Sequence, residues 1–277
     1  MQLTRAVEKI IENAGLTVKD TGCGYVLGCQ TEPKAFFAHN PLHILALYTA
    51  AASLNATVEW SVFEAANTSA PRIATLPAKQ VCDTIQAILL SEHPETLAPL
   101  VTAGGFVRFG IKGDAPCLHV LAGLPATVAT RWWGFLHLCK ANITLVGARL
   151  SFPPKRTKLL CAYETAFASP VPTTITALKK LLSGLPLFDF TVAATAFAQL
   201  NPAWQQSIPL YAQLCKSKEP YHTTQLAVTA AELRAEHIYS RRTNWIFAQL
   251  LETVIKEPRL NTYPALIALA RTLNSCS

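Results

Sequence analysis

Two pairs of cysteine and histidine have the spacing that a nucleophile and its general base could use. Cys117 and His119 form one pair, and His137 and Cys139 form the other. On a strand, alternate side chains point to the same face. Neither pair has a third group that would orient the base, and acidic residues are too dispersed to offer a carboxylate pair. We therefore expect this chain not to be an enzyme.

A cysteine and histidine group near the N-terminus could bind a metal, but its spacing is poor. Five residues separate Cys23 from Cys29, and His39 and His43 follow with a proline between them. Zinc sites usually place two ligands two to four residues apart in each half. We predict no metal ion and no other cofactor.

A lysine between two glycines could approach a phosphate. Lys112 lies between Gly110 and Gly113. The segment lacks the Gly-Lys-Ser/Thr ending of a phosphate-binding loop, so it is predicted to be a strand turn that could approach a nucleic acid.

Positive charge is concentrated in the middle of the chain. The net charge is +7, and residues 131–218 alone hold ten Lys and Arg against two acidic residues. This polarisation is typical of a protein that binds a polyanion, because neutralised phosphates release counterions. The alternative interpretation is that these basic residues only keep the protein soluble and are clustered by chance.

The segment SFPPKRTK, residues 151–158, is the sharpest local feature of this basic region. Its two prolines stiffen a turn, and Lys155, Arg156 and Lys158 follow directly. Arg149 precedes the turn on a predicted strand. A rigid basic loop presents its charges to a phosphate backbone at low entropic cost, which favours phosphate contact over a merely solvated loop.

Two further groups complete the predicted interface. Arg131 adjoins the tryptophans Trp132 and Trp133, which could stack on unpaired bases or lie half in the core. Arg241 and Arg242 begin an amphipathic helix and could contact phosphates or form ion pairs. The predicted nucleic-acid-binding residues are Arg131, Arg149, Lys155, Arg156, Lys158, Lys112, Trp132, Arg241 and Arg242. No catalytic residue is predicted.

The apolar pattern predicts which elements carry these residues. Helices are expected at 3–14, from Asn40 and Pro41 onward, and at 79–90, with a strand at 57–63. Short β-prone runs between residues 106 and 150 predict a central antiparallel sheet. Further helices are expected at 173–183, 202–215, 224–237, 241–256 and 264–274. The predicted class is α+β, with a helical N-terminal part, a central antiparallel sheet and a helical C-terminal region. We divide the chain into a mixed part at 1–170 and a helical domain at 171–277.

Composition bears on the partners and the cellular location expected for this chain. Charged residues make up only 15% of the chain, below the roughly 25% of an ordinary domain, so some surface is expected to lie against partner subunits. The eight cysteines are scattered, which favours a reducing cytoplasm. No long uninterrupted apolar run or signal peptide is recognised.

The order of these segments resembles a known family. A cysteine-bearing turn (TGCGYVLGC) precedes a helical stretch, the unit GGFVRFGIKGDAPCLHVLAGLPATVA and a helical C-terminal region. This layout is similar to the large subunit of type IV CRISPR effector complexes. The resemblance implies a non-enzymatic subunit of an RNA-guided complex that contacts guide RNA, target DNA and other subunits. The family's four-cysteine zinc knuckle would have only Cys23 and Cys29 here.

Two other functions stay open from the sequence. One is a protein scaffold or assembly factor of phage or plasmid origin, whose basic middle is incidental. The other is an enzyme that acts on a small substrate through a cysteine.

Overall fold

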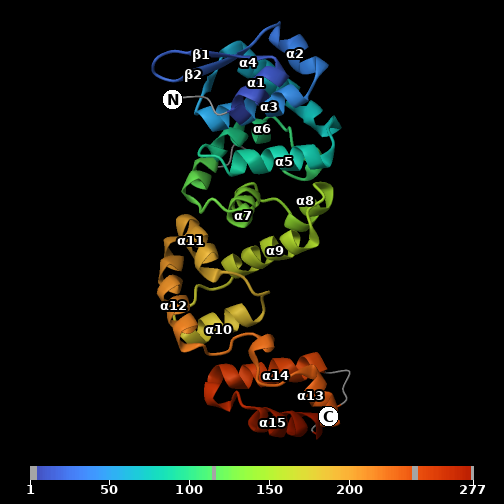
Figure 1. The fold of residues 1–277 in the computed structure, drawn as a ribbon, viewed down its shortest axis with the longest axis vertical. Helices are drawn as coiled ribbons and strands as arrows, with labels where there is room; N and C mark the ends of the chain where they lie inside the picture. Colours follow the sequence, from blue (N-terminus) through green and yellow to red (C-terminus); the bar gives the residue numbers. More distant parts are fainter. Residues whose placement is uncertain (1–4, 114–116, 239–242, 276–277) are drawn as a thin grey trace. The chain divides into compact units, whose positions relative to one another are not determined.

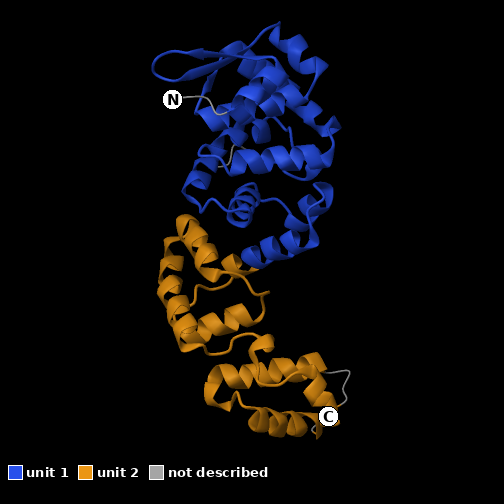
Figure 2. Cartoon of the chain, in the orientation of Figure 1, with its two compact units in different colours: residues 1–164 blue, residues 165–277 orange. Residues whose placement is uncertain are grey.

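The computed structural model describes residues 5–113, 117–238 and 243–275 (Figure 1). The chain divides into two compact units, residues 1–164 and 165–277 (Figure 2). Many helices and one small sheet make up the described residues, which confirms the α+β class with helical N- and C-terminal regions. No described helix has the length and apolar character needed to cross a membrane.

The sheet of unit 1 lies near the N-terminus rather than in the centre of the chain. Strands β1 (Leu16–Asp20) and β2 (Tyr25–Cys29) pair antiparallel, and β3 (Thr57–Val58) joins β2 in parallel. The glycine-rich segment between β1 and β2 is therefore the turn of a hairpin. Gly22 has φ of +76° there, a left-handed conformation that a glycine adopts without steric cost.

Five main helices accompany this sheet in the N-terminal half of unit 1. They are α1 (Arg5–Ala14), α2 (Pro33–His39), α3 (Leu42–Leu54), α4 (Trp60–Ser69) and α5 (Ala78–Leu89). Helices α1 and α3 contact the strands of the sheet. Helix α3 is buried on most of its surface and packs against both α1 and α5. The strand predicted at 57–63 ends after two residues, because α4 begins at Trp60.

The centre of the chain is helical, which corrects the predicted strands between residues 106 and 150. The elements found there are η3 (Val107–Phe109), η4 (Leu118–Gly123), α7 (Val128–Leu138) and α8 (Ile143–Arg149). Residues 130–136 of α7 are all buried, so its sequence shows an apolar run without helical periodicity. Such a run cannot be distinguished from a buried strand by pattern alone. N-capping residues mark these segments as helices. The side chain of Thr127 accepts the N–H of Thr130 at the start of α7, and that of Asn142 accepts the N–H of Leu145 at the start of α8.

The segment SFPPKRTK begins a helix instead of forming a loop. Helix α9 runs over Pro154–Ala168, so its first turns carry Lys155, Arg156 and Lys158. Proline is well tolerated at the start of a helix, because the missing N–H would have no intrahelical acceptor there. Gly147 of α8 allows close packing on α9, since a Cβ at this position would lie 2.7 Å from Oγ1 of Thr157.

Unit 2 is built of helices with two groups of core residues. The main elements are α10 (Ile175–Ser183), α11 (Phe190–Leu200), α12 (Ser207–Ser217), α13 (Ala230–Ala235), α14 (Thr243–Lys256) and α15 (Tyr263–Ser275), with short 3-10 helices between some of them. Helix α11 is absent from the helices that the sequence pattern predicts. Its Phe190 and Phe197 contact Trp204, while Leu250 and Leu266 belong to a second cluster further along the chain.

Candidate nucleic-acid interface

Of the three basic residues at the start of α9, two are exposed to solvent and one packs against other side chains. Lys155 and Lys158 are exposed and stand three residues apart, which places them on neighbouring positions of one helix face. Arg156 is half-buried: its guanidinium lies 5.1 Å from the ring centroid of Phe152 and its Nη1 is 3.9 Å from Sγ of Cys82. Arg156 therefore links α9 to α5, and the two lysines are the residues that offer charge to a ligand.

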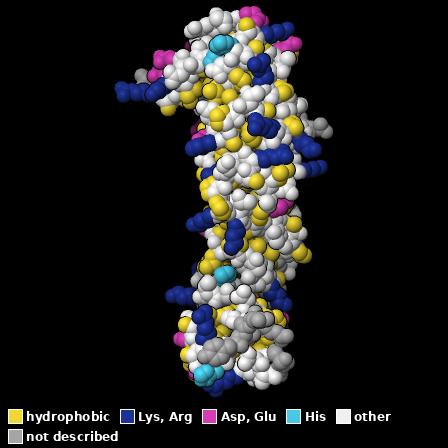
Figure 3. Space-filling model, turned by 90° about the vertical axis from the view of Figure 1, so that its right-hand side faces the viewer, with side chains coloured by type: hydrophobic (Ala, Val, Ile, Leu, Met, Phe, Trp, Pro, Cys, Tyr) yellow, Lys and Arg dark blue, Asp and Glu magenta, His cyan; other side chains and the backbone are white. Residues whose placement is uncertain are grey.

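Arg149 and Lys112 also face solvent in unit 1. Arg149 occupies the last turn of α8 and donates from Nη1 to the carbonyl of Arg108, at 2.8 Å. Figure 3 shows Lys and Arg side chains scattered over the face in view, together with a smaller number of acidic side chains, several of which lie near the top. The exposed residues Arg149, Lys155 and Lys158 form what we call the basic surface around α8 and α9, and their contact with phosphates stays a prediction.

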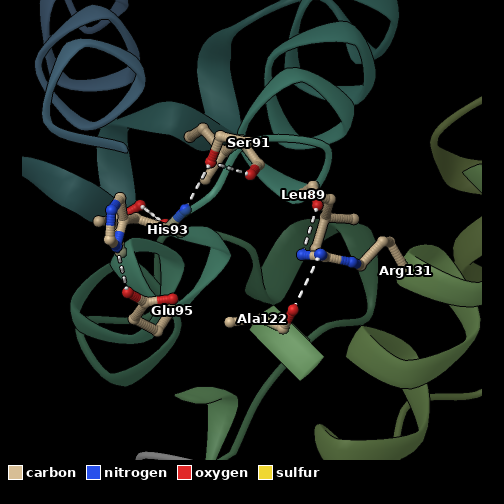
Figure 4. A network of polar contacts seen from close by, with 8 residues as sticks. Leu89, Ser91, His93, Glu95, Ala122 and Arg131 are labelled. Carbon is tan, nitrogen blue, oxygen red and sulfur yellow. Dashed lines mark hydrogen bonds and ion pairs between the residues drawn. The ribbon is translucent and has the colours of Figure 1, made fainter. Parts of the chain in front are cut away.

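Arg131 does not belong to this surface. Its exposed fraction is 4%, and its guanidinium donates to the carbonyl of Leu124 at 3.1 Å. It also donates to the carbonyls of Leu89 and Ala122, both at 3.2 Å (Figure 4). Burial lowers the pKa of Arg131, and the charge of Glu95 opposes that shift. The side chain joins the C-terminal end of α5 to η4, where it satisfies carbonyls that the helix end leaves open.

The paired tryptophans of α7 are likewise part of the core. Trp132 and Trp133 are both fully buried. Trp132 packs edge-on against Phe135 and Phe152, and Nε1 of Trp133 donates to the Glu164 carboxylate at 2.9 Å. Neither ring can stack on a base without unfolding α7, so the interface excludes Trp132 and Arg131.

Arg241 and Arg242 lie outside the described residues. Their predicted phosphate contacts stay a prediction.

The two cysteine and histidine pairs lie in helical segments, so strand alternation does not bring their members together. Cys139 is buried at the end of α7, and burial raises its pKa to about 12. A thiol with that pKa stays protonated at neutral pH and is a poor nucleophile. His137 instead pairs with Glu164 at 3.1 Å, and this contact lowers the pKa of Glu164. The arrangement serves to connect α7 with α9.

Among the described residues, no three His, Cys, Asp or Glu side chains come together in a way that could hold a metal ion. Cys23 is exposed in the hairpin turn, and Sγ of Cys29 donates to the carbonyl of Thr31 at 3.1 Å.

A pocket that sequence reasoning missed lies between α1, α3 and α5. Its volume is about 580 Å³. Leu42, Leu45 and Ala46 contribute apolar surface, while polar groups come from all three helices. The full lining is Ile10, Asn13, Ala14, Asn40, Leu42, His43, Leu45, Ala46, Thr49, Gln80, Asp83, Thr84 and Ala87. An apolar cavity with a few convergent polar groups is the usual form of a small-molecule site.

Asn40 and His43 form the polar pair of this pocket. Nδ2 of Asn40 lies 3.2 Å from Nε2 of His43, and Oδ1 of Asn40 accepts the Leu42 N–H at 3.0 Å. The His43 ring stacks on Phe36 with centroids 4.4 Å apart. Burial lowers the pKa of His43 while the backbone of Phe36 opposes that shift, so the imidazole is neutral at pH 7. Its Nδ1 is buried without a well-formed hydrogen bond.

The local sequence holds only a partial signal for this pocket. Its pattern identifies Asn40 as the residue before a helix and His43 as a poor zinc ligand. Asn13, Thr49 and Asp83 come from segments far apart in the chain, and only the packing of three helices brings them together.

Comparison with known proteins defines the fold. No protein-family model matches the sequence, and a search of curated proteins gives no match. The structure is similar to the crystal structure of the CCA-adding enzyme of Bacillus stearothermophilus in complex with CTP, with a TM-score of 0.70 and 14% identity. The similarity covers 91% of this chain and 66% of that chain, so the present chain spans only part of the enzyme's length.

This comparison corrects the resemblance drawn from the sequence. The fold is similar to that of part of a CCA-adding enzyme, which overturns the resemblance to a type IV CRISPR large subunit. The prediction of a non-enzymatic subunit of an RNA-guided complex was wrong for the same reason. It rested on the order of predicted segments, and the central strands that carried much of that order are helices.

Proposed function

We propose that this chain is part of an enzyme that adds nucleotides to RNA, and that it binds the incoming nucleotide and the RNA. The observation that carries the proposal is the fold similarity, at a TM-score of 0.70, to a CCA-adding enzyme in complex with CTP. The pocket between α1, α3 and α5 and the basic surface around α8 and α9 support it, because one suits a base and the other suits phosphates.

The polar pair of the pocket is complementary to one edge of a base. Asn40 offers an amide N–H and a carbonyl oxygen, and its bonds to His43 and to the Leu42 N–H hold the amide in one orientation. Cytosine and adenine both present an amino donor, at N4 and N6. Each has a ring nitrogen acceptor beside that donor. A fixed amide can therefore read both bases in the same way, and it would read uracil or guanine poorly.

We assign the binding of the nucleotide and of the RNA to the described residues, and we assign none of these residues to nucleotidyl transfer. Nucleotidyl transfer uses divalent metal ions held by carboxylates, and the described residues do not bring together a group that fits such an ion.

We place the protein in the cytoplasm, because all seven described cysteines are free thiols, as a reducing compartment would keep them.

Nucleotide binding by the pocket is tested with CTP, ATP, UTP and GTP titrated into the purified chain. We expect CTP and ATP to bind more tightly than UTP and GTP. Asn40→Ala should weaken CTP binding about tenfold, because a hydrogen bond to a buried base edge contributes on the order of 1 kcal/mol or more. His39→Ala is the matched control, since His39 is exposed and does not line the pocket.

The class of enzyme is tested by transfer of labelled CTP or ATP to the 3′ end of an RNA. Incorporation by the chain supports the proposal directly. Tight CTP binding that Asn40→Ala weakens about tenfold, without incorporation, supports the binding role within an enzyme whose metal site lies outside the described residues. Absence of binding to any nucleotide and to RNA would overturn the proposal.

A further inference from the structure

A second, smaller pocket in unit 1 is lined by two arginines. Its volume is about 330 Å³, and its lining is Leu76, Ala78, Arg108, Phe109 and Arg149. The two arginines come from different elements, η3 and the last turn of α8. No acidic residue lines this pocket, so its charge is strongly positive.

The backbone holds both arginines at the pocket. Nη1 of Arg149 donates to the carbonyl of Arg108 at 2.8 Å, and Nη1 of Arg108 donates to the carbonyl of Ala74. Each of these hydrogen bonds occupies one of the five N–H donors of a guanidinium, so further donors can face a ligand. Within the described ranges, neither arginine forms an ion pair with an acidic side chain.

A glycine fixes the local backbone. Gly110 ends η3 with φ of +87°, a left-handed conformation that other residues adopt only at a steric cost. A Cβ at this position would approach Leu145 of α8 to 3.2 Å. The turn therefore brings η3 against α8, the two elements that supply the arginines.

The start of α5 adds to the positive character of the pocket. Ala78 is the first residue of this twelve-residue helix, and Pro77 before it supplies no side-chain cap. The first N–H groups of a helix carry partial positive charge and favour an anion. This feature reinforces the two arginines, which remain the basis of the inference.

We propose that Arg108 and Arg149 bind a phosphate group in this pocket. Planar guanidinium groups bind phosphate oxygens in a bidentate way, and their charge does not depend on pH in the physiological range. The phosphate belongs either to the backbone of an RNA or to a free nucleotide. This source rests on the proposed function, whereas the anion site itself rests only on the geometry of the pocket.

The test compares three probes: a short single-stranded RNA, CTP and inorganic phosphate. The variants are Arg108→Gln and Arg149→Gln, singly and together. Arg72→Gln is the matched control, because Arg72 is an exposed arginine of η1 (Ala70–Thr75) that does not line the pocket. Thermal unfolding of each variant verifies that the fold is retained.

We expect the double variant to weaken RNA binding about tenfold or more and to reduce its salt dependence, because fewer phosphates are neutralised. Arg149→Lys should bind RNA more tightly than Arg149→Gln but more weakly than the wild type, since lysine keeps the charge but has no planar fork. A loss confined to RNA identifies a backbone phosphate. A loss confined to CTP identifies a nucleotide phosphate. Either outcome supports the site.

Inorganic phosphate separates this proposal from the proposed function. The Nε–Hε NMR signals of Arg108 and Arg149, assigned with the single variants, should shift on phosphate titration while that of Arg72 stays in place. This holds even if the chain binds neither RNA nor CTP. Unchanged arginine signals, or binding of RNA and CTP that the double variant leaves intact, would show that the two arginines do not form a phosphate site.

Discussion

At the scale of single residues, burial decides which arginines can reach a ligand. Arg131 and Arg149 look alike in the sequence, since both are basic residues among apolar neighbours. Arg131 is 4% exposed and bonded to three backbone carbonyls, whereas Arg149 is exposed and lines a pocket. A guanidinium with all its bonds directed into the fold contributes to stability and is not available for recognition.

The role of Arg131 leads to a prediction about stability. Arg131→Met should lower the free energy of unfolding by about 2 to 5 kcal/mol, because the carbonyls of the buried residues Leu89 and Leu124, and that of Ala122, lose their donors. Denaturant unfolding measures this loss. The surface variant Arg72→Met should change stability by no more than about 0.5 kcal/mol.

The same substitution separates structure from recognition. Below its melting temperature, folded Arg131→Met protein should bind RNA as the wild type does. A variant of unchanged stability with weakened RNA binding would contradict the structural role assigned to Arg131.

At the scale of elements, polar contacts join helices that the sequence does not show to be neighbours. Glu164 of α9 accepts from Nε1 of Trp133 and pairs with His137, both on α7. Gly147 brings α8 close to α9, and Gly110 brings η3 close to α8. These contacts hold the helices that carry the basic surface of unit 1.

The contact between α7 and α9 predicts a dependence of stability on pH. Hydrogen bonding to His137 is the main cause that lowers the pKa of Glu164 below its ordinary value of 4.5. A carboxylate with a lowered pKa in the folded state stabilises the protein above its unfolded pKa. This stabilisation is lost as the pH falls through the folded pKa.

Unfolding free energies of the wild type and Glu164→Gln should therefore differ most near neutral pH and converge as the pH falls below about 4.5. Glu92→Gln, in the same unit and away from this contact, is the control. A difference that does not shrink in acid would show that the charge of Glu164 is not what stabilises the contact.

At the scale of the whole molecule, the charge distribution is the property that the sequence reveals directly. The net charge is +7, and its excess lies in residues 131–218. The structure shows that this excess includes buried and packed residues: Lys179 is buried and paired with Glu219, and Arg156 lies over Phe152. The charge that can act on a ligand is therefore smaller than the sum suggests.

Exposed charge at the start of α9 should contribute to RNA binding. Lys155→Ala with Lys158→Ala should weaken binding of single-stranded RNA. The negative slope of the logarithm of the binding constant against the logarithm of the salt concentration should become shallower by about 0.7 for each phosphate that is no longer neutralised. The control is Lys19→Ala with Lys256→Ala, which removes two lysines paired with Glu59 and Glu252. Equal effects of both double variants would show that net charge, and not this helix face, drives binding.

The sequence by itself determined the features that depend on local chemistry. The turn in the glycine-rich segment around Gly22, helix α3 after Asn40 and Pro41, and helix α5 follow from turn residues, helix starts and periodic apolar positions. The concentration of basic residues also required no tertiary information. Each of these depends on neighbours within a few positions, which is why the pattern was sufficient.

The tertiary structure alone decided the rest. Residues 130–136 of α7 are all buried, so an element that is helical looked like a strand, and the resemblance built on such strands was wrong. The burial of Arg131 and the pockets beside Asn40 and Arg149 depend on side chains from helices distant in the chain. Long-range packing creates these sites, and local sequence patterns do not specify which distant residues meet.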